Sequence, residues 1–243
     1  MAKIPSGSVS SRAAVIGSSG GIGRALCVAL AAHGFGVRAL SRSPDAGAGD
    51  DAQPIDITSE KSIELAADRL RAEAPFNLIF LATGLLHDEH IRPEKALREI
   101  DQQSLMRLFA VNSVGPAVVA KHFVSLLPRD GRCVFAALSA RVGSISDNRL
   151  GGWYGYRVSK AALNMTIKTI AIELARTHPE AICVGLHPGT VDTSLSKPFQ
   201  RGAPARQLFS PDQAATNLLD VVERLTPTQS DRCFAWNGAE IAP

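Results

Sequence analysis

The sequence contains few cysteines, few aromatic residues and almost no excess of charge. Its 243 residues include 4 cysteines, which lie far apart and form neither CxxC pairs nor Cys/His clusters. This spacing argues against a disulfide framework and against a structural zinc site. Aromatic residues make up 5% of the chain, and 26 basic residues oppose 23 acidic ones, for a formal net charge of +3. No run of five or more Lys or Arg is present, so we expect no nucleic-acid partner.

The sequence also lacks a long hydrophobic segment. Its longest apolar stretches, such as 25–32 and 76–82, are far shorter than the roughly 20 residues that span a bilayer. The N-terminal segment is polar and has no apolar core, unlike a secretory signal. We therefore expect a polar tail at 1–10, no membrane partner and a cytoplasmic location.

What the sequence does contain is a hydrophobic fraction of 45%, enough for one large core over 11–243. Short apolar runs alternate with segments of helical period, which is typical of βαβ units. The predicted fold class is α/β: a doubly wound parallel sheet of about seven strands flanked by helices, in a single domain. The expected strands are 13–16, 36–40, 53–55, 76–81, 132–138, 181–186 and 233–236. The expected helices are 22–33, 59–73, 102–127, 154–177 and 211–225.

One late segment, 194–209, has a composition of its own. It carries two prolines, three basic residues and no clear period. Ligands of such sheets bind beyond the carboxyl ends of the strands, and this segment follows a late strand. We therefore expect it to form a lid over a substrate.

A glycine-rich turn joins the first expected strand to the first expected helix. Gly17, Gly21 and Gly23 form a G-x-x-x-G-x-G pattern, which allows a tight turn and brings a pyrophosphate close to a helix N-terminus. The turn predicts a dinucleotide site. The residues that we assign to it are Gly17, Ser19, Gly21, Ile22 and Gly23. A P-loop would need Lys and Ser or Thr after its last glycine, and Ile22 follows Gly21 here.

The same turn also fits G-x-S-x-G, the pattern of a hydrolase nucleophile elbow, with Ser19 as the nucleophile. The acid and base of a triad would then be Asp192 and His187. This hypothesis is the weaker one, because the acid follows the histidine and no oxyanion-hole segment precedes the turn.

Arg42 follows the second expected strand, where an NAD site would place an acidic residue on the ribose hydroxyls. A cation at this position suits a 2′-phosphate instead, so we expect NADP and consider NAD less suited. After the third strand, Asp56 and Ile57 could hold the adenine edge. Capping of the next helix is an equally good explanation of Asp56.

Tyr156 and Lys160 open a helix, and their i, i+4 spacing places them on one face. A nearby ammonium stabilises a phenolate and lowers the phenol pKa from its usual value near 10. Tyr156 could then exchange a proton with a carbonyl or alcohol oxygen while a nicotinamide carries the hydride.

The order of these motifs resembles the short-chain dehydrogenase/reductase family over about 11–243. The matching segments are 17–23, 56, 81–84, 111–115, 139, 156–160 and 188–193. Further segments, 84–87, 93–95, 141–145 and 151–154, resemble the branch that includes the C-factor signalling proteins and the sniffer-type carbonyl reductases.

The resemblance implies a Rossmann fold and an NADP(H)-dependent oxidoreductase that transfers a hydride between nicotinamide and a small carbonyl or alcohol substrate. Tyr156 would be the general acid/base, Lys160 would hold the nicotinamide ribose, and Asn112 would leave room for a water in the proton relay. Further cofactor contacts are implied for Ala82, Thr83, Gly84, Pro188, Gly189 and Val191. By the same resemblance, the two long helices would form a homodimer or homotetramer.

The sequence departs from the family where a serine usually orients the substrate oxygen. In the segment 139–143, Ala140 stands at that place. Ser139, which we assign to the site, could serve if the strand bulges or ends there, Ser144 could reach in, or the hydrogen bond could be absent. This departure motivates an alternative function, an NAD(P)-binding signalling or scaffold protein of the C-factor type with weak turnover. We expect no metal site, because the polar segment 87–90 lacks metal-binding helical spacing.

Overall fold

The structure of the chain is a computed structural model that describes residues 11–43, 52–202 and 208–243. The expected tail at 1–10 and residues 203–207 of the expected lid lie outside the described residues.

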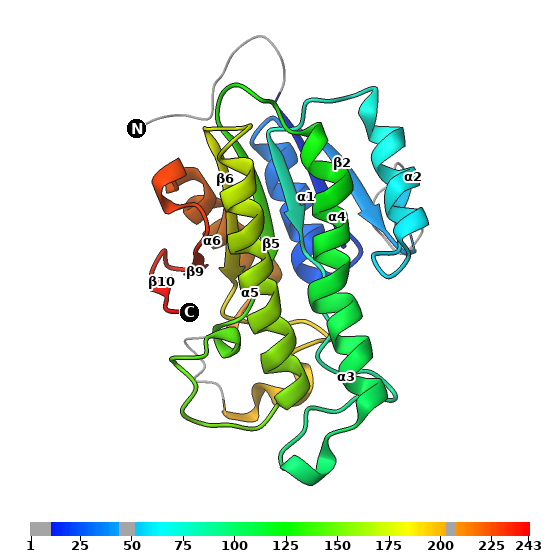
Figure 1. Cartoon of the computed structure of the whole chain (residues 1–243), viewed down its shortest axis with the longest axis vertical. Coiled ribbons are helices and arrows are strands. Elements are labelled where there is room, and N and C mark those ends of the chain that lie inside the picture. Colours follow the sequence, from blue (N-terminus) through cyan, green and yellow to red (C-terminus); the bar gives the residue numbers. More distant parts are fainter. Residues whose placement is uncertain (1–10, 44–51, 203–207) are drawn as a thin grey trace.

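A mostly parallel sheet of eight strands forms the centre of the molecule, in the order β10-β9-β6-β5-β4-β1-β2-β3 (Figure 1). Its strands are β1 (Arg12–Ile16), β2 (Gly36–Ser41), β3 (Gln53–Pro54), β4 (Leu78–Leu81), β5 (Cys133–Leu138), β6 (Ala181–His187), β9 (Cys233–Ala235) and β10 (Glu240–Ile241). The prediction of a doubly wound sheet is confirmed. The count is eight instead of seven because a short antiparallel strand, β10, pairs with β9 at the edge.

Helices cover both faces of this sheet (Figure 1). The helices are α1 (Gly21–Ala32), α2 (Glu60–Arg71), α3 (Gln102–Phe109), α4 (Gly115–Phe123), α5 (Tyr154–Leu174) and α6 (Pro211–Arg224). Alternate residues of each strand point to opposite faces, and β1 shows the result. Ala14 and Ile16 pack in one core cluster with α2, α4 and α5, whereas Ala13 and Val15 pack in the other with α1 and α6.

The long expected helix over 102–127 is one helical run with an irregular centre. A π-helical turn, Ala110–Val114, separates α3 from α4. By length and composition the run Gln102–Leu126 could cross a membrane, and 44% of its apolar 18-residue window is buried. Its α4 part packs Val119, Ala120 and Phe123 into the core, as an apolar helix of a globular domain does.

The helix starts that position the site follow ordinary capping chemistry. The Ser59 side chain accepts a hydrogen bond from the Ser62 backbone N–H at α2, and Ser210 caps α6 just before Pro211. A second, two-stranded sheet pairs β7 (Thr190–Val191) with β8 (Leu208–Phe209) beyond the end of β6. Its two-residue strands are too short to leave a periodic signal in the sequence.

Candidate active site

The glycine turn lies between β1 and α1, as the sequence predicts. The backbone N–H groups of Gly17 and Ser18 donate to the Leu40 carbonyl at 2.8 and 3.0 Å, which fixes the turn against β2. Gly17 has a φ of +91°, which favours glycine. A Cβ on Gly23 would lie 2.2 Å from the Gly17 carbonyl oxygen, so this turn can close only with glycine at position 23.

A polar cavity of about 670 Å³ opens beside this turn. The predicted site residues that line it are Gly17, Ser19, Arg42, Asp56, Ile57, Ala82, Thr83 and Gly84. The hydroxyl oxygens of Ser41 and Thr83, which also line it, are buried and have no hydrogen-bond partner in the described structure. Buried polar atoms normally have partners, so these two hydroxyls fit a polar ligand such as a dinucleotide.

Asp56 lies at the edge of this cavity and is already hydrogen-bonded. Its Oδ1 accepts from the Thr58 backbone N–H at 2.9 Å and from the Thr58 hydroxyl at 2.7 Å. These bonds, with a smaller contribution from the Arg42 charge, hold the Asp56 pKa below its usual value. The N-cap of α2 is Ser59, so the capping explanation of Asp56 is replaced by a turn at Asp56–Thr58 that leaves its carboxylate at the cavity.

A second, narrower cavity joins the glycine turn to Tyr156 and Lys160. It is lined by Gly21, Ile22, Tyr156, Lys160 and Pro188, among others. Tyr156 and Lys160 lie in the first turns of α5, and the Lys160 Nζ is 5.9 Å from the centroid of the Tyr156 ring. The helical spacing predicted from the sequence therefore places both side chains at one site.

Burial dominates the electrostatics of this pair. Burial raises the pKa of Tyr156 to about 12, opposite to the lowering that we expected from Lys160. Burial likewise lowers the pKa of Lys160 from 10.5 to about 8. Lys160 is 2% exposed, and its ammonium donates to the Leu138 carbonyl at 2.8 Å, which directs it toward the end of β5. In this state, Tyr156 is therefore a protonated phenol at neutral pH.

Asn112 lies behind the site, within the π-helical turn, and is 1% exposed. Its side chain forms two 2.8 Å bonds with the backbone of Leu85 and donates to the Ser159 hydroxyl at 3.0 Å. Such π turns occur frequently at functional sites, because they widen a helix locally. Asn112 thus links the loop after β4 to α5 without lining the cavities.

The structure shows where the hydroxyls of Ser139 and Ser144 lie relative to Tyr156. β5 ends at Leu138, so Ser139 stands at a strand end, which is a condition under which Ser139 could serve. However, the Ser139 hydroxyl donates to the Asn164 Oδ1 at 2.6 Å. The Ser144 hydroxyl accepts from the Asp147 backbone N–H and lies near the Pro243 carbonyl. Within the described part of the chain, neither serine hydroxyl is hydrogen-bonded to Tyr156. Ala140 lines a third cavity, which Tyr156 also lines.

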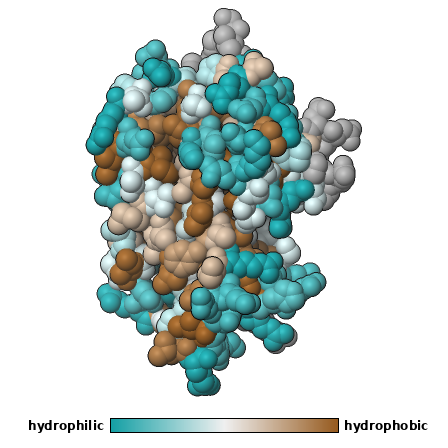
Figure 2. All heavy atoms as spheres, turned by 45° about the vertical axis from the view of Figure 1, so that its right-hand side comes forward, coloured by the Kyte–Doolittle hydropathy of each residue, from teal (hydrophilic) through white to brown (hydrophobic). Residues whose placement is uncertain are grey.

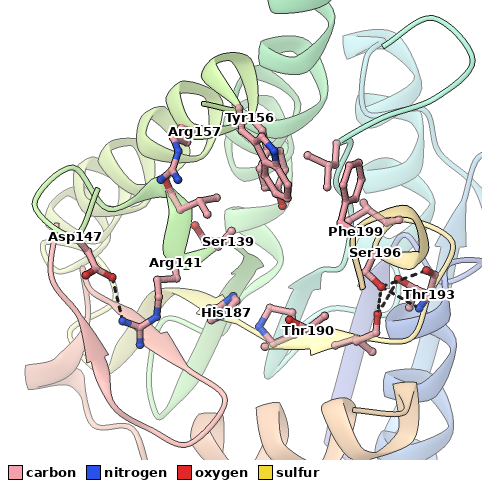
Figure 3. A pocket seen from close by; sticks show the side chains of 18 of the residues that line it. Ser139, Arg141, Asp147, Tyr156, Arg157, His187, Thr190, Thr193, Ser196 and Phe199 are labelled. Atoms are coloured by element: carbon pink, nitrogen blue, oxygen red, sulfur yellow. Dashed lines mark hydrogen bonds and ion pairs between the residues drawn. The ribbon is translucent and has the colours of Figure 1, made fainter. Parts of the chain in front are cut away.

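This third cavity, of about 680 Å³, lies on the other side of Tyr156 and is lined mainly by apolar groups (Figure 3). Trp153 forms its aromatic wall: its ring centroid is 6.2 Å from that of Tyr156 and 5.1 Å from that of Phe199, both edge-on. Phe199 comes from the segment expected to form a lid. Pro188, Gly189 and Val191 line the opposite side, where the predicted nicotinamide contacts lie.

Glu94, which holds the start of α5 beside this cavity, gives little signal in the sequence. Glu94 is 4% exposed, and both of its carboxylate oxygens accept from the Gly155 backbone N–H at 3.2 Å. A carboxylate at this place stabilises the N-terminus of α5. Trp153, the residue just before α5, has a φ of 52°, an unusual backbone conformation for a residue with a large side chain. It follows two glycines of positive φ.

The structure separates the residues of the hydrolase alternative. Ser19 lines the polar cavity, whereas His187 lines the apolar one. Asp192 accepts from the Gln200 side chain at 3.0 Å. The polar segment near His87 also has its own partners: a ring nitrogen of His87 lies 3.1 Å from the Leu195 carbonyl, and Asp88 pairs with Arg107 at 2.9 Å. Among the described residues, no three His, Cys, Asp or Glu side chains gather as metal ligands.

Comparisons with known proteins agree with this geometry. The family model described as short chain dehydrogenase matches residues 11–203. C-signal of Myxococcus xanthus is 35% identical over 147 residues, which cover 60% of this chain and 82% of that protein. A 1-hydroxy-2-glutathionyl-2-methyl-3-butene dehydrogenase of Rhodococcus sp. (strain AD45) is 31% identical over 189 residues, which cover 77% of this chain and 78% of that protein.

Solved structures show the same fold. The NADPH-bound carbonyl reductase from chicken fatty liver superimposes with a TM-score of 0.82 at 22% identity, covering 96% of this chain and 94% of that one. The matched family model includes the glycine turn, Asn112, Tyr156 and Lys160. The chain therefore belongs to the short-chain dehydrogenase family, in the branch that includes C-signal, and is an NAD(P)-dependent oxidoreductase of carbonyl and alcohol groups.

Proposed function

We propose that the protein is an NADP(H)-dependent carbonyl reductase. The observation that carries this proposal is the position of Tyr156, whose side chain lines both the narrow cavity beside the glycine turn and the apolar cavity under Trp153. A proton donor at this junction can meet a substrate on one side and a nicotinamide on the other. When bound, NADPH would supply a hydride to the carbonyl carbon of the substrate.

The chain's own residues supply the rest of the chemistry. The protonated phenol of Tyr156 donates its proton to the carbonyl oxygen as that oxygen gains negative charge. Lys160 holds its ammonium behind the phenol, anchored on Leu138, where the positive charge favours the transient loss of the phenol proton. Trp153 and Phe199 exclude water and favour a substrate with an apolar or aromatic body.

The preference for NADP(H) rests on Arg42. Its side chain is exposed at the mouth of the polar cavity, beside Asp56 and just after β2. In this kind of sheet the residue after the second strand faces the adenosine ribose, so a guanidinium there binds a 2′-phosphate. The chicken liver carbonyl reductase, which is similar in fold, is described as NADPH-bound.

The proposal is tested by mixing the purified protein with NADPH and a panel of aldehydes and ketones, and following NADPH absorbance. We expect oxidation of NADPH with aromatic carbonyls such as para-nitrobenzaldehyde, and slower oxidation of NADH. Binding of NADPH without oxidation by any carbonyl of the panel would contradict the reductase proposal. That outcome would favour the alternative of a cofactor-binding signalling protein, which Ala140 and the likeness to C-signal motivate.

Arg42→Glu tests the cofactor assignment separately. Reversing the charge places a carboxylate where the 2′-phosphate would lie, so we expect the ratio of kcat/KM for NADPH to that for NADH to fall by about 30-fold. Arg71→Glu is the matched control, since this exposed arginine of α2 pairs with Asp68 and does not line the cavity. An unchanged ratio in Arg42→Glu would refute the role of Arg42.

We also propose that two copies of the chain pair through α3 and α5. Large apolar side chains are exposed on the run from α3 to the π turn and on α5: Met106, Val114, Val158, Met165 and Ile172. In Figure 2 the molecule is turned so that the right-hand side of Figure 1 comes forward. Hydrophobic side chains gather in the middle of this face. Sedimentation velocity should show a dimer for the wild type and a monomer for Met165→Glu.

A further inference from the structure

His187 is a partly exposed polar side chain that lines the apolar cavity, and the chemistry described so far does not use it. It is the last residue of β6, which pairs with β5 in the register Leu138 to Leu186. The Ser139 backbone N–H donates to the Leu186 carbonyl at 2.8 Å. This ladder places His187 on the strand next to Ser139 and Ala140, at the carboxyl ends of the strands.

Figure 3 shows that the imidazole of His187 lies between Arg141 and Thr190, on the side of the cavity opposite α5, from which the Tyr156 side chain extends inward. The Nδ1 atom of His187 is buried and has no hydrogen-bond partner in the described structure. An unpaired buried polar atom of this kind costs about 1–3 kcal/mol. Because Nδ1 has almost no accessible surface, the ring meets the cavity through its exposed part, and a ligand that the ring binds there would give a reason to retain a histidine.

The ring is uncharged at neutral pH. Burial, followed by the positive charge of Arg141, lowers the pKa of His187 to about 4. A neutral imidazole offers one N–H donor and one acceptor nitrogen. It can therefore hydrogen-bond either a carbonyl oxygen or an alcohol hydroxyl without bringing a charge into an apolar cavity.

The serine and arginine side chains around His187 are already engaged with other residues. The Ser139 hydroxyl is bound to Asn164, the Ser144 hydroxyl faces the Asp147 backbone and the C-terminal end, and Ala140 has no polar side-chain atom. Arg141 pairs with Asp147 at 3.1 Å. Among the described residues at these strand ends, His187 thus brings to the cavity an imidazole ring whose Nδ1 is not engaged by another side chain.

We propose that the His187 imidazole hydrogen-bonds the reacting oxygen of the substrate and holds it against the Tyr156 phenol, in place of the hydroxyl that Ala140 lacks. This inference rests on the proposed reductase function. It assigns His187 as a substrate-binding residue at the reacting oxygen and explains how the site can work with alanine at position 140.

The test compares His187→Ala, His187→Asn, Ala140→Ser and the double variant Ala140→Ser/His187→Ala, with para-nitrobenzaldehyde and NADPH. Loss of one hydrogen bond to the reacting oxygen should lower kcat of His187→Ala by about 10-fold or more, with little change in the Kd of NADPH. Asn offers both a donor and an acceptor and should retain most of the activity. The serine of the double variant should restore at least half of the lost kcat on a logarithmic scale.

A merely structural role for His187 would give a different pattern. His178→Ala is the matched control, because His178 is buried, at 7% exposure, lies just beyond the C-terminal end of α5 and does not line the cavity. It should lose thermal stability and keep kcat, whereas His187→Ala should lose kcat and keep or gain stability, since the unpaired nitrogen is removed.

The proposal is overturned if His187→Ala keeps kcat/KM within twofold of the wild type, or if Ala140→Ser restores nothing in the double variant. Its failure is distinguishable from failure of the reductase proposal. If only the His187 proposal fails, the wild type oxidises NADPH with the aldehyde, but the variants do not show the expected loss or recovery of kcat. If the reductase proposal fails, the wild type itself is inactive.

Discussion

Tyr156→Phe is expected to lower kcat for carbonyl reduction by about 10²- to 10⁴-fold, the range that a positioned general acid contributes. The change removes one hydroxyl and keeps the ring, so the edge contact with Trp153 at 6.2 Å is retained. Because burial raises the Tyr156 pKa to about 12, the phenol is protonated and ready to donate at neutral pH. Steady-state kinetics at saturating NADPH measure the loss, and the Kd of NADPH should stay within a few-fold.

Tyr154→Phe is the matched control for this experiment. Tyr154 lies two residues before Tyr156 on the same helix, but Val158 stands four residues after it instead of a lysine. It should keep kcat within twofold. Retention of more than a tenth of wild-type activity in Tyr156→Phe would mean that another group donates the proton, and the assignment of Tyr156 would fail.

The parts of this site that the sequence predicted are those fixed by local chemistry. The spacing of Tyr156 and Lys160 determines their common face on α5, and the glycines at 17, 21 and 23 determine the turn, because each depends on a few neighbouring residues. The strands of the parallel sheet were likewise predictable within a few residues from their apolar runs. The two-residue strands β7, β8 and β10 were not, because they depend on pairing and carry no period.

The rest depends on contacts between residues far apart in the chain. The Ser139 hydroxyl is committed to Asn164, which lies 25 residues later on α5, and Glu94 reaches Gly155 across 61 residues. Phe199 meets Trp153 from the segment after β7. The pKa of Tyr156 differs from the expected direction for the same reason, since burial by the whole fold outweighs the charge of one neighbour.

Lys160→Met is expected to lower activity strongly and, at the same time, to stabilise the protein without cofactor. Lys160 is 2% exposed, and burial lowers its pKa from 10.5 to about 8. The folded state therefore releases its proton more readily than the unfolded state, so burial of the ammonium destabilises the fold at neutral pH. The difference between the two pKa values corresponds to about 3 kcal/mol, the full amount of which is present below about pH 8.

Methionine has a similar length and carries no charge, so it removes this cost, while the Leu138 carbonyl loses a hydrogen bond worth about 1 kcal/mol. We expect the variant to be more stable than the wild type by about 2 kcal/mol at pH 7, measured by urea denaturation. Activity should fall by about 10³-fold, because the charge behind the Tyr156 phenol is lost.

The pH dependence separates this cause from better packing. Lys160 binds fewer protons in the folded than in the unfolded state between about pH 8 and 10.5, so the wild type recovers its stability over that interval and the advantage of Lys160→Met shrinks. The cysteines are common to both proteins, but the Cys233 thiol interacts with the Lys160 charge, so both proteins are compared in a Cys233→Ser background, in which their difference isolates Lys160. A variant that is less stable than the wild type at pH 7, or an advantage that does not change up to pH 10, would contradict the cost assigned to the buried ammonium. The expected pairing of lost activity with gained stability would show that this lysine is retained for chemistry at the expense of the fold.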